Sequence, residues 1–130
     1  MDTPPDEGND LDLQLAALDT NFSLSLPGRL KEISEGCRRL LDGAAAPAEL
    51  ESLGLHVHKL AGSGTTFGSP EISVAALALE GSIKRAMAGR RADREEILAE
   101  LSALDTAIGR RLSGHRARPG GDTPSSRGIL

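Results

Sequence analysis

A chain of 130 residues is long enough for one domain with a sizeable hydrophobic core, and a second folded domain of ordinary size is not expected. Its only aromatic residues are two Phe, so Leu, Ile, Val and Ala must build the core. That composition favours packed helices over a sheet and leaves no aromatic surface for stacking nucleic-acid bases. The formal net charge of -4 excludes the strongly basic surface of a nucleic-acid-binding protein.

One cysteine, Cys37, excludes an intrachain disulfide and is typical of a protein from a reducing compartment. Its spacing from neighbouring apolar residues predicts a small, buried hydrophobic side chain. No apolar run approaches the roughly 20 residues of a membrane span, and the acidic start lacks the basic region of a secretory signal. We therefore expect a cytoplasmic protein with neither a membrane nor a nucleic-acid partner.

The two ends of the chain differ in charge. Residues 1–10 combine two Pro and a Gly with four acidic residues, which predicts a disordered acidic leader. Residues 115–130 are polar and contain several Arg, which predicts a flexible basic tail. After the leader, residues 11–18 predict a short helix that covers one end of the main fold, because its leucines recur at helical spacing: Leu11, Leu15 and Leu18.

Two amphipathic helices are predicted next. The first spans about residues 26–41, with Pro27 in its first turn, where a missing N–H costs little, and Gly43 just beyond its end. The second spans about residues 47–67, and its apolar spacing of 3, 4, 3, 4 and 3 is typical of a bundle seam. The expected inward-facing residues are Leu26, Leu30, Ile33, Cys37, Leu40 and Leu41 in the first helix, and Leu50, Leu53, Val57, Leu60, Gly64 and Phe67 in the second.

Two further helices complete the pattern. The residues Ser69–Glu71 are typical of a helix start and predict a third helix that ends near Gly89. Asp93, with a Glu three positions later, predicts the start of a fourth helix that closes with two arginines and Gly114. The expected inward-facing residues are Ile72, Ala76, Leu79, Ile83 and Met87 in the third helix, and Ile97, Leu101, Leu104, Ile108 and Leu112 in the fourth.

Four amphipathic helices joined by short connections predict an all-α protein. We expect residues 11–114 to form an antiparallel up-and-down four-helix bundle with a short additional N-terminal helix. No strand-like alternation competes with this interpretation.

The second helix carries two histidines that point in different directions. At 100° per residue, His58 lies about 130° from the inward direction, whereas His56 lies about 70° from it on the other side. We therefore expect an exposed His58 and a partly buried His56, and the two cannot share a metal ion.

An outer strip of the same helix surrounds His58. At helical offsets from it lie an exposed leucine, Leu55, and a glycine, Gly62, together with Thr65 and Thr66. An outward leucine offers an apolar contact to a partner, and a glycine one turn along permits close approach of a partner backbone. Glycine inside a helix costs around 1 kcal/mol relative to alanine, so its presence here indicates a functional site.

Residues 58–68 read HKLAGSGTTFG, and the next helix contains Leu77-Ala78-Leu79-Glu80. This pattern resembles the signature of histidine-phosphotransfer (HPt) domains: His, any residue, Leu, a small or basic residue, Gly and Ser, then a Gly that ends the helix and a Leu-Glu pair on the next one. The resemblance implies that His58 accepts a phosphoryl group and that Gly62 keeps it accessible. It also implies a phosphocarrier rather than an enzyme, which relays phosphate between receiver-domain aspartates in bacterial-type two-component signalling.

Many members of this family place a Lys three residues after the histidine, where this chain has Ala61. Lys59 is the nearest substitute for charge assistance, and Lys84 and Arg85 of the third helix are further sources of positive charge. Glu80 is expected to be structural, bonding a neighbouring helix or solvent. The expected surface for receiver domains comprises Leu55, Gly62, Ser63, Thr65, Thr66, Lys84 and Arg85.

The chain itself is expected to bind neither a cofactor nor a metal ion. The glycine-rich run after His58 lacks the Lys of a nucleotide-binding phosphate loop, and no carboxylate cluster accompanies the histidine in the sequence. The resemblance implies that the partner receiver domain holds both the aspartyl phosphate and Mg²⁺. We expect a monomer, because one bundle face is needed for docking and the sequence indicates no second large apolar patch.

Two other functions are compatible with the pattern. A regulatory module could dock a receiver or kinase domain without accepting phosphate, and it would tolerate the loss of His58. A ligand-binding or metal-binding enzyme built in the bundle core would need inward Glu and His residues, but the seams contain Leu, Ile, Val and Ala. The variant His58→Gln separates the first alternative from a phosphocarrier.

Overall fold

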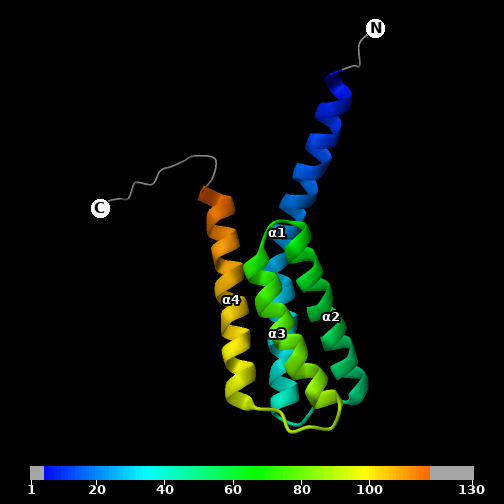
Figure 1. Ribbon diagram of the computed structural model, residues 1–130, viewed down its shortest axis with the longest axis vertical. Helices are drawn as coiled ribbons and strands as arrows, with labels where there is room; N and C mark the ends of the chain where they lie inside the picture. The colour runs from blue at the N-terminus through cyan, green and yellow to red at the C-terminus, as the bar shows by residue number, and fades with distance from the viewer. Residues whose placement is uncertain (1–4, 118–130) are drawn as a thin grey trace, which may run out of the picture.

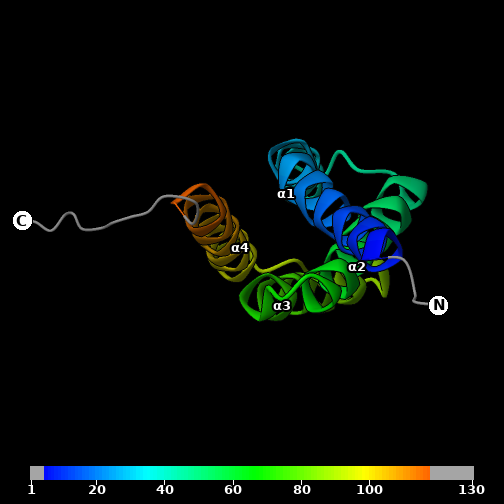
Figure 2. The same ribbon diagram turned by 90° about the horizontal axis from the view of Figure 1, so that it is seen from above.

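The computed structural model describes the backbone of residues 5–117 and the side chains of residues 10–114. This part of the chain forms four α-helices and no strand: α1 (Pro5–Leu41), α2 (Pro47–Thr66), α3 (Pro70–Met87) and α4 (Arg94–Ala117). The helices run up and down in an antiparallel bundle (Figure 1). Each helix packs against its two neighbours in the order α1, α2, α3, α4 (Figure 2). The predicted all-α, up-and-down four-helix bundle is confirmed.

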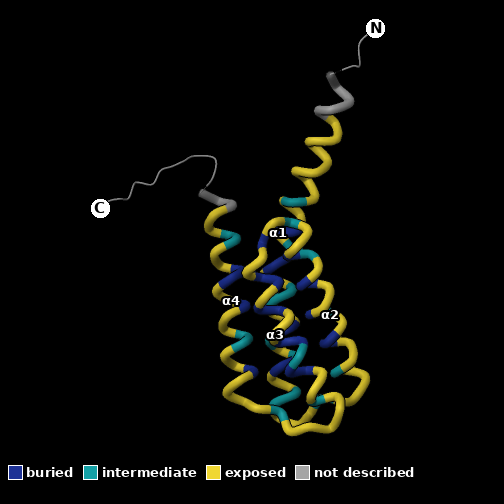
Figure 3. Tube along the Cα trace, viewed as in Figure 1, coloured by how far each residue is buried: buried dark blue, intermediate teal, exposed yellow. Residues whose placement is uncertain are grey.

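The core lies along the predicted seams, and buried positions face the bundle axis in Figure 3. One prediction is wrong: Met87, the last residue of α3, is exposed because the helix ends there beyond most of the core. The predicted inward residues that are buried are Leu26, Ile33 and Cys37 in α1, Leu53, Val57, Leu60 and Gly64 in α2, Ile72, Ala76, Leu79 and Ile83 in α3, and Ile97, Leu104 and Ile108 in α4.

The helix boundaries follow local chemistry. The Asp93 carboxylate accepts the backbone N–H of Glu96 at 3.1 Å, which is the predicted cap of α4. Just after the ends of α1, α2 and α3, the backbone turns through positive φ at Gly43 (71°), Gly68 (75°) and Gly89 (84°). A residue with a side chain is strained in that conformation, so glycine favours each stop.

The first helix differs from the prediction. The separate cover helix at residues 11–18 is not present, because α1 is one continuous helix of 37 residues. Pro27 lies inside it, and the cost of about 3 kcal/mol for an interior proline is outweighed by the core packing of Leu26 before it and Ile33 after it, both fully buried. Residues 5–10 of the predicted leader belong to α1, whereas residues 1–4 lie outside the described part of the chain.

The end of the fourth helix also differs. Helix α4 does not stop at Gly114 but continues to Ala117, and residues 118–130 of the predicted tail lie outside the described residues. Within residues 5–117 no helix is both long and apolar enough to cross a membrane.

A partly buried arginine ties three parts of the bundle together. Arg111 of α4 donates to Asp19 of α1 at 2.6 Å and to the carbonyl of Phe67, in the α2–α3 turn, also at 2.6 Å. The same guanidinium donates to the hydroxyls of Ser23 and Ser69 and lies 5.1 Å from the ring centroid of Phe22. The turn that follows the histidine-bearing helix is therefore held by α1 and α4 together.

Candidate functional site

His58 lies on the outer face of α2, as the helical angle predicts. Its side chain is 63% exposed, while its neighbour Val57 and the nearby Leu60 are fully buried. His56 is partly buried on the flank of the helix, with its Nδ1 3.5 Å from a carboxylate oxygen of Glu32 on α1. The two histidines therefore face different neighbours, and His58 is the more exposed of the two.

The imidazole of His58 is held by a buried carboxylate on the neighbouring helix. Glu80 of α3 is only 8% exposed at its side chain, and its Oε2 and Oε1 lie 3.0 Å and 3.2 Å from Nδ1 of His58. A carboxylate can only accept hydrogen bonds, so Nδ1 must carry the hydrogen, and the lone pair of the neutral ring is on Nε2. The arrangement fixes the ring and presents a nucleophilic nitrogen to the exterior.

The sequence predicts that Glu80 bonds a neighbouring helix or solvent, but it does not name the partner. The Leu-Glu pair of the motif was the signal that could have found it. The structure adds that this glutamate positions the histidine.

A lysine completes the group around His58. The Nζ of Lys84 lies 3.3 Å from Oε2 of Glu80, one helical turn along α3, and its side chain is exposed. One carboxylate oxygen thus contacts both the imidazole and the ammonium group. The ammonium group of Lys84 therefore places positive charge near the ring of His58. This charge comes from α3 and not from α2, where Ala61 occupies the position at which many family members have a lysine.

The two glycines after His58 have different surroundings. A Cβ atom at Gly64 would lie 2.7 Å from the hydroxyl of Ser73 and 3.1 Å from the carbonyl of Ser69, so close packing of α2 on α3 requires glycine there. A Cβ atom at Gly62 would meet nothing within 4 Å. The fold itself does not require glycine at Gly62, and the space beside His58 is open.

Comparison with protein-family models gives one match. A family model described as the Hpt domain matches residues 11–110. The chain belongs to the Hpt domain family. Comparison with curated proteins and with solved structures gives no match. Members of the family are phosphocarrier modules that act in two-component signalling and interact with receiver domains.

Two predicted basic residues of this Hpt domain lie away from the ring edge. Arg85 turns towards α4, where it contacts Glu96 at 3.1 Å and the hydroxyl of Ser82 at 2.9 Å. Lys59 is exposed and lines a hollow on the α1 side of α2, together with Glu32 and His56. Lys84 is therefore the only one of the three predicted cations that the described structure joins to the His58–Glu80 pair.

The predicted polar residues at the end of α2 take part in packing as well as in the surface. The Ser73 hydroxyl of α3 donates to the carbonyl of Ala61 at 2.6 Å and lies 2.9 Å from the hydroxyl of Thr65. The hydroxyl of Thr66 donates to the carbonyl of Gly62 at 3.1 Å, and Ser63 is partly buried. These contacts anchor the last two turns of α2 on α3 and keep the Gly62 surface in place.

Exposed leucines flank the histidine on both helices of this Hpt domain. Leu55 lies one turn before His58 on α2, and Leu77 lies one turn before Glu80 on α3; both are exposed. The sequence predicts Leu55 as a partner contact but not Leu77, because the position of Leu77 relative to α2 depends on how the helices pack. Together with the open Gly62 they form an apolar rim around a polar centre.

Proposed function

We propose that this Hpt domain accepts a phosphoryl group on Nε2 of His58 from an aspartyl phosphate of one receiver domain and passes it to an aspartate of another. One observation supports the proposal above all. The imidazole is exposed, and a buried carboxylate occupies its Nδ1, so the nitrogen left for chemistry is Nε2, on the ring edge away from Glu80. Attack on phosphorus requires an accessible, correctly oriented lone pair.

The proposed step conserves the proton on Nδ1. The Nε2 lone pair forms an N–P bond while the P–O bond to the aspartyl carboxyl group breaks, and the aspartate leaves with the electron pair as a carboxylate. The ring then carries a positive charge, which the hydrogen bond from Nδ1 to Glu80 stabilises. Hydrogen bonds to charged groups contribute about 1.5–3 kcal/mol, which makes Glu80 a positioning residue whose effect grows as the reaction proceeds.

Positive charge beside the ring favours the phosphorylated form. A phosphoryl group adds about two negative charges, and Lys84 is the described cation already joined to Glu80. We assign charge assistance chiefly to Lys84. Lys59, one residue from His58 along α2, is a second candidate because its ammonium group is exposed.

The proposed docking surface surrounds His58. It comprises the apolar rim of Leu55 and Leu77, the open Gly62, and the polar residues Ser63, Thr65, Thr66, Lys84 and Arg85 at its edges. Apolar contacts around a polar centre are typical of protein interfaces. The missing side chain at Gly62 leaves room for a receiver loop to reach the imidazole.

The Mg²⁺ ion that this chemistry calls for is proposed to reside on the partner receiver domain. Among the described residues of this chain, no group of three or more His, Cys, Asp or Glu residues is arranged to hold a metal ion. This chain then supplies only the positioned nucleophile and its neighbouring charges. A cytoplasmic location is part of the same proposal, and a single free cysteine, Cys37, is compatible with it.

The test is transfer from a receiver domain. A purified receiver carrying radioactive aspartyl phosphate is mixed with this chain in the presence of Mg²⁺, and the label is followed on a gel. We expect label on this chain that is lost in acid and stable in base, and no label on His58→Gln. The variant His56→Gln is the matched control and should retain the label.

Two results would count against the proposal. Label that survives acid, or that remains on His58→Gln, would contradict phosphorylation of this histidine. Absence of label, together with receiver binding that His58→Gln preserves, would favour the docking module that does not accept phosphate.

A further inference from the structure

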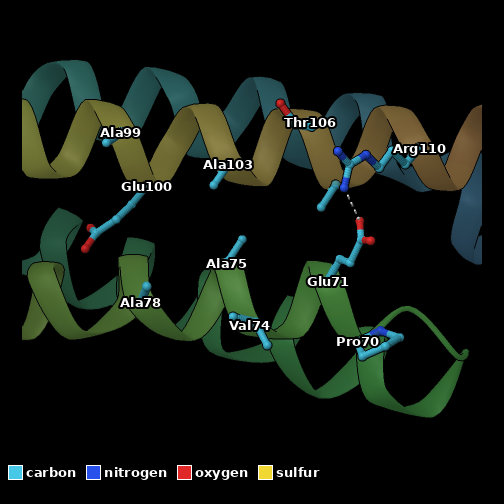
Figure 4. A pocket seen from close by; sticks show the side chains of 11 residues that line it. Pro70, Glu71, Val74, Ala75, Ala78, Ala99, Glu100, Ala103, Thr106 and Arg110 are labelled. Atoms are coloured by element: carbon cyan, nitrogen blue, oxygen red, sulfur yellow. Dashed lines mark hydrogen bonds and ion pairs between the residues drawn. The ribbon is translucent and has the colours of Figure 1, made fainter.

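An apolar groove of about 710 Å³ lies between α3 and α4 on the outside of the bundle. Its walls are formed mainly by small side chains, and alanines from the two helices face each other across it in Figure 4. On the α3 wall, the side of Val74 is 68% exposed. An apolar surface on the outer side of a helix is typical of a helix that another segment covers. The groove-lining alanines are Ala75, Ala78, Ala99, Ala103 and Ala107.

The groove continues towards the end of α4. A second hollow, of about 280 Å³, shares four lining residues with the groove and extends to Gly114, three residues before α4 ends. The start of α3 and the end of α4 lie at the same end of the bundle (Figure 1). The chain that follows α4 therefore begins at the open end of the groove. The shared residues are Pro70, Glu71, Ala107 and Arg110.

We propose that residues 118–130, called the tail segment below, fold back along α4 and place Ile129 and Leu130 in the groove between α3 and α4. These are the two large apolar side chains of the tail segment. In the groove they would lie among alanines, which leave room for them. Large side chains of one segment then fill the space that small side chains of the other leave open.

The tail segment has the sequence and the length for this path. Residues 119–121 read Pro-Gly-Gly, which is typical of a change in chain direction directly after a helix. Ile129 is twelve residues beyond Ala117, which gives it a reach of about 40 Å in extended chain. Ala103, in the middle of the groove, lies only about 21 Å back along α4 from Ala117. The remaining length is enough for the reversal.

The charges of the groove also favour the tail segment. Glu71 and Arg110 pair with each other at 3.3 Å, whereas Glu100 accepts a hydrogen bond from the hydroxyl of Ser82 at 2.7 Å. Glu100 is thus the groove acid that has no ion pair within residues 10–114. Its partial burial raises the pKa of its carboxyl above the usual range, so a cation beside it would stabilise the charged form. Arg127, two residues before the apolar pair, would supply that cation.

A tethered segment suits the size of the groove better than a separate chain does. Standard interfaces use about 20–30 residues from each partner, and eleven residues line the groove. A segment held near its site by a short connection has an effective concentration of about a millimolar, so a small contact is enough to dock it. No second copy is required, and the expectation of a monomer stays a prediction. The expectation of a flexible tail is the one that this inference replaces.

The test is paramagnetic NMR on the full chain, with a nitroxide attached at Ser126→Cys in the tail segment. The nitroxide reagent should react at this new cysteine and not at Cys37, because the Cys37 thiol is buried. We expect enhanced relaxation of the backbone amides of Ala99 and Ala103, at the part of the groove far from the start of the tail segment. The amide of Glu51, at the other side of the bundle on α2, should be unaffected.

Three variants identify the contact. Ile129→Asp in the tail segment and Ala103→Glu in the groove should each remove the relaxation effect at Ala99. The matched control is Thr123→Asp, which adds the same charge nearer the reversal and should keep the effect. Phosphoryl transfer to Ile129→Asp should be unchanged, because His58 does not line the groove. Failure of the tail contact and failure of the proposed function would therefore be seen separately.

A mixture distinguishes the tail segment of the same chain from that of a second copy. Isotope-labelled chain without a nitroxide is mixed with an equal amount of unlabelled chain that carries it, and we expect no relaxation effect at Ala99. An effect in this mixture would assign the groove to a second copy and overturn the inference. An effect confined to the last turn of α4, or one that Ile129→Asp leaves unchanged, would overturn it as well.

Discussion

The hydrogen bond between Glu80 and His58 yields the sharpest kinetic prediction. Replacing Glu80 with Gln removes the negative charge but keeps an oxygen that can accept from Nδ1, whereas Glu80→Ala removes both. The charged hydrogen bond contributes about 1.5–3 kcal/mol in full, and the 63% exposure of the His58 side chain lowers this to about 1–2 kcal/mol through solvent screening. That loss corresponds to phosphoryl transfer about 5- to 30-fold slower for Glu80→Ala.

The assay is the single-turnover transfer rate from a phosphorylated receiver at increasing receiver concentration. Because Glu80 is buried and does not reach the docking surface, the maximal rate should fall while the half-saturating receiver concentration stays the same. If the charge matters most, Glu80→Gln should resemble Glu80→Ala; if orientation matters most, it should retain most of the rate. An exposed control, Glu71→Gln, should transfer normally. A maximal rate within twofold of the unmodified protein for Glu80→Ala would refute the reasoning.

Three further predictions concern stability and docking. Arg111→Ala should lower the free energy of unfolding, measured in urea, by about 3 kcal/mol, because the guanidinium is only 12% exposed and donates to four partners. The exposed control Arg110→Ala should lower it by less than about 0.5 kcal/mol. Equal losses for the two variants would contradict the stabilising role of the Arg111 contacts. Gly64→Ala should destabilise the fold by about 1–3 kcal/mol, because its methyl group would clash with Ser73, whereas Gly62→Ala should stabilise it by up to about 1 kcal/mol. Gly62→Leu should weaken receiver binding by filling the space beside His58. Destabilisation by Gly62→Ala would contradict the open space at that position. Burial, with a contribution from the charge of a nearby glutamate, raises the pKa of the Cys37 thiol from 9.0 to about 11, so the folded state holds this proton longer than the unfolded state. The contribution of the Cys37 thiol to the free energy of unfolding is complete below pH 9 and declines by about 2–3 kcal/mol as the pH rises towards 11. This decline should be absent from unfolding measurements on Cys37→Ala.

Periodicity was sufficient to predict the bundle because the seams of α2, α3 and α4 are regular. It also predicted the direction of His58, since the inward face of α2 is defined by residues that turned out to be buried, such as Val57 and Leu60. A rotation of 100° per residue then leaves little freedom for the histidine. These features depend on one helix at a time, which is why the sequence alone determines them.

Features that depend on two helices were not predicted. The contact between Glu80 and His58 requires the rotation of α3 against α2, and the contacts of Arg111 with Asp19 and Ser23 join residues about 90 positions apart. The continuity of α1 through Pro27 had the same origin, because local propensity favours a break there and tertiary packing overrides it. A local rule cannot supply these contacts.

The central claim is that Nε2 of His58 is the phosphorylated atom. Long-range proton–nitrogen NMR of the histidine side chains, recorded before and after transfer from a receiver, tests it most directly. Before transfer, the account predicts hydrogen on Nδ1 and a lone pair on Nε2; afterwards, it predicts phosphorus coupling at Nε2 with the Nδ1 hydrogen retained. Phosphorus coupling at Nδ1, or at another histidine, would contradict it.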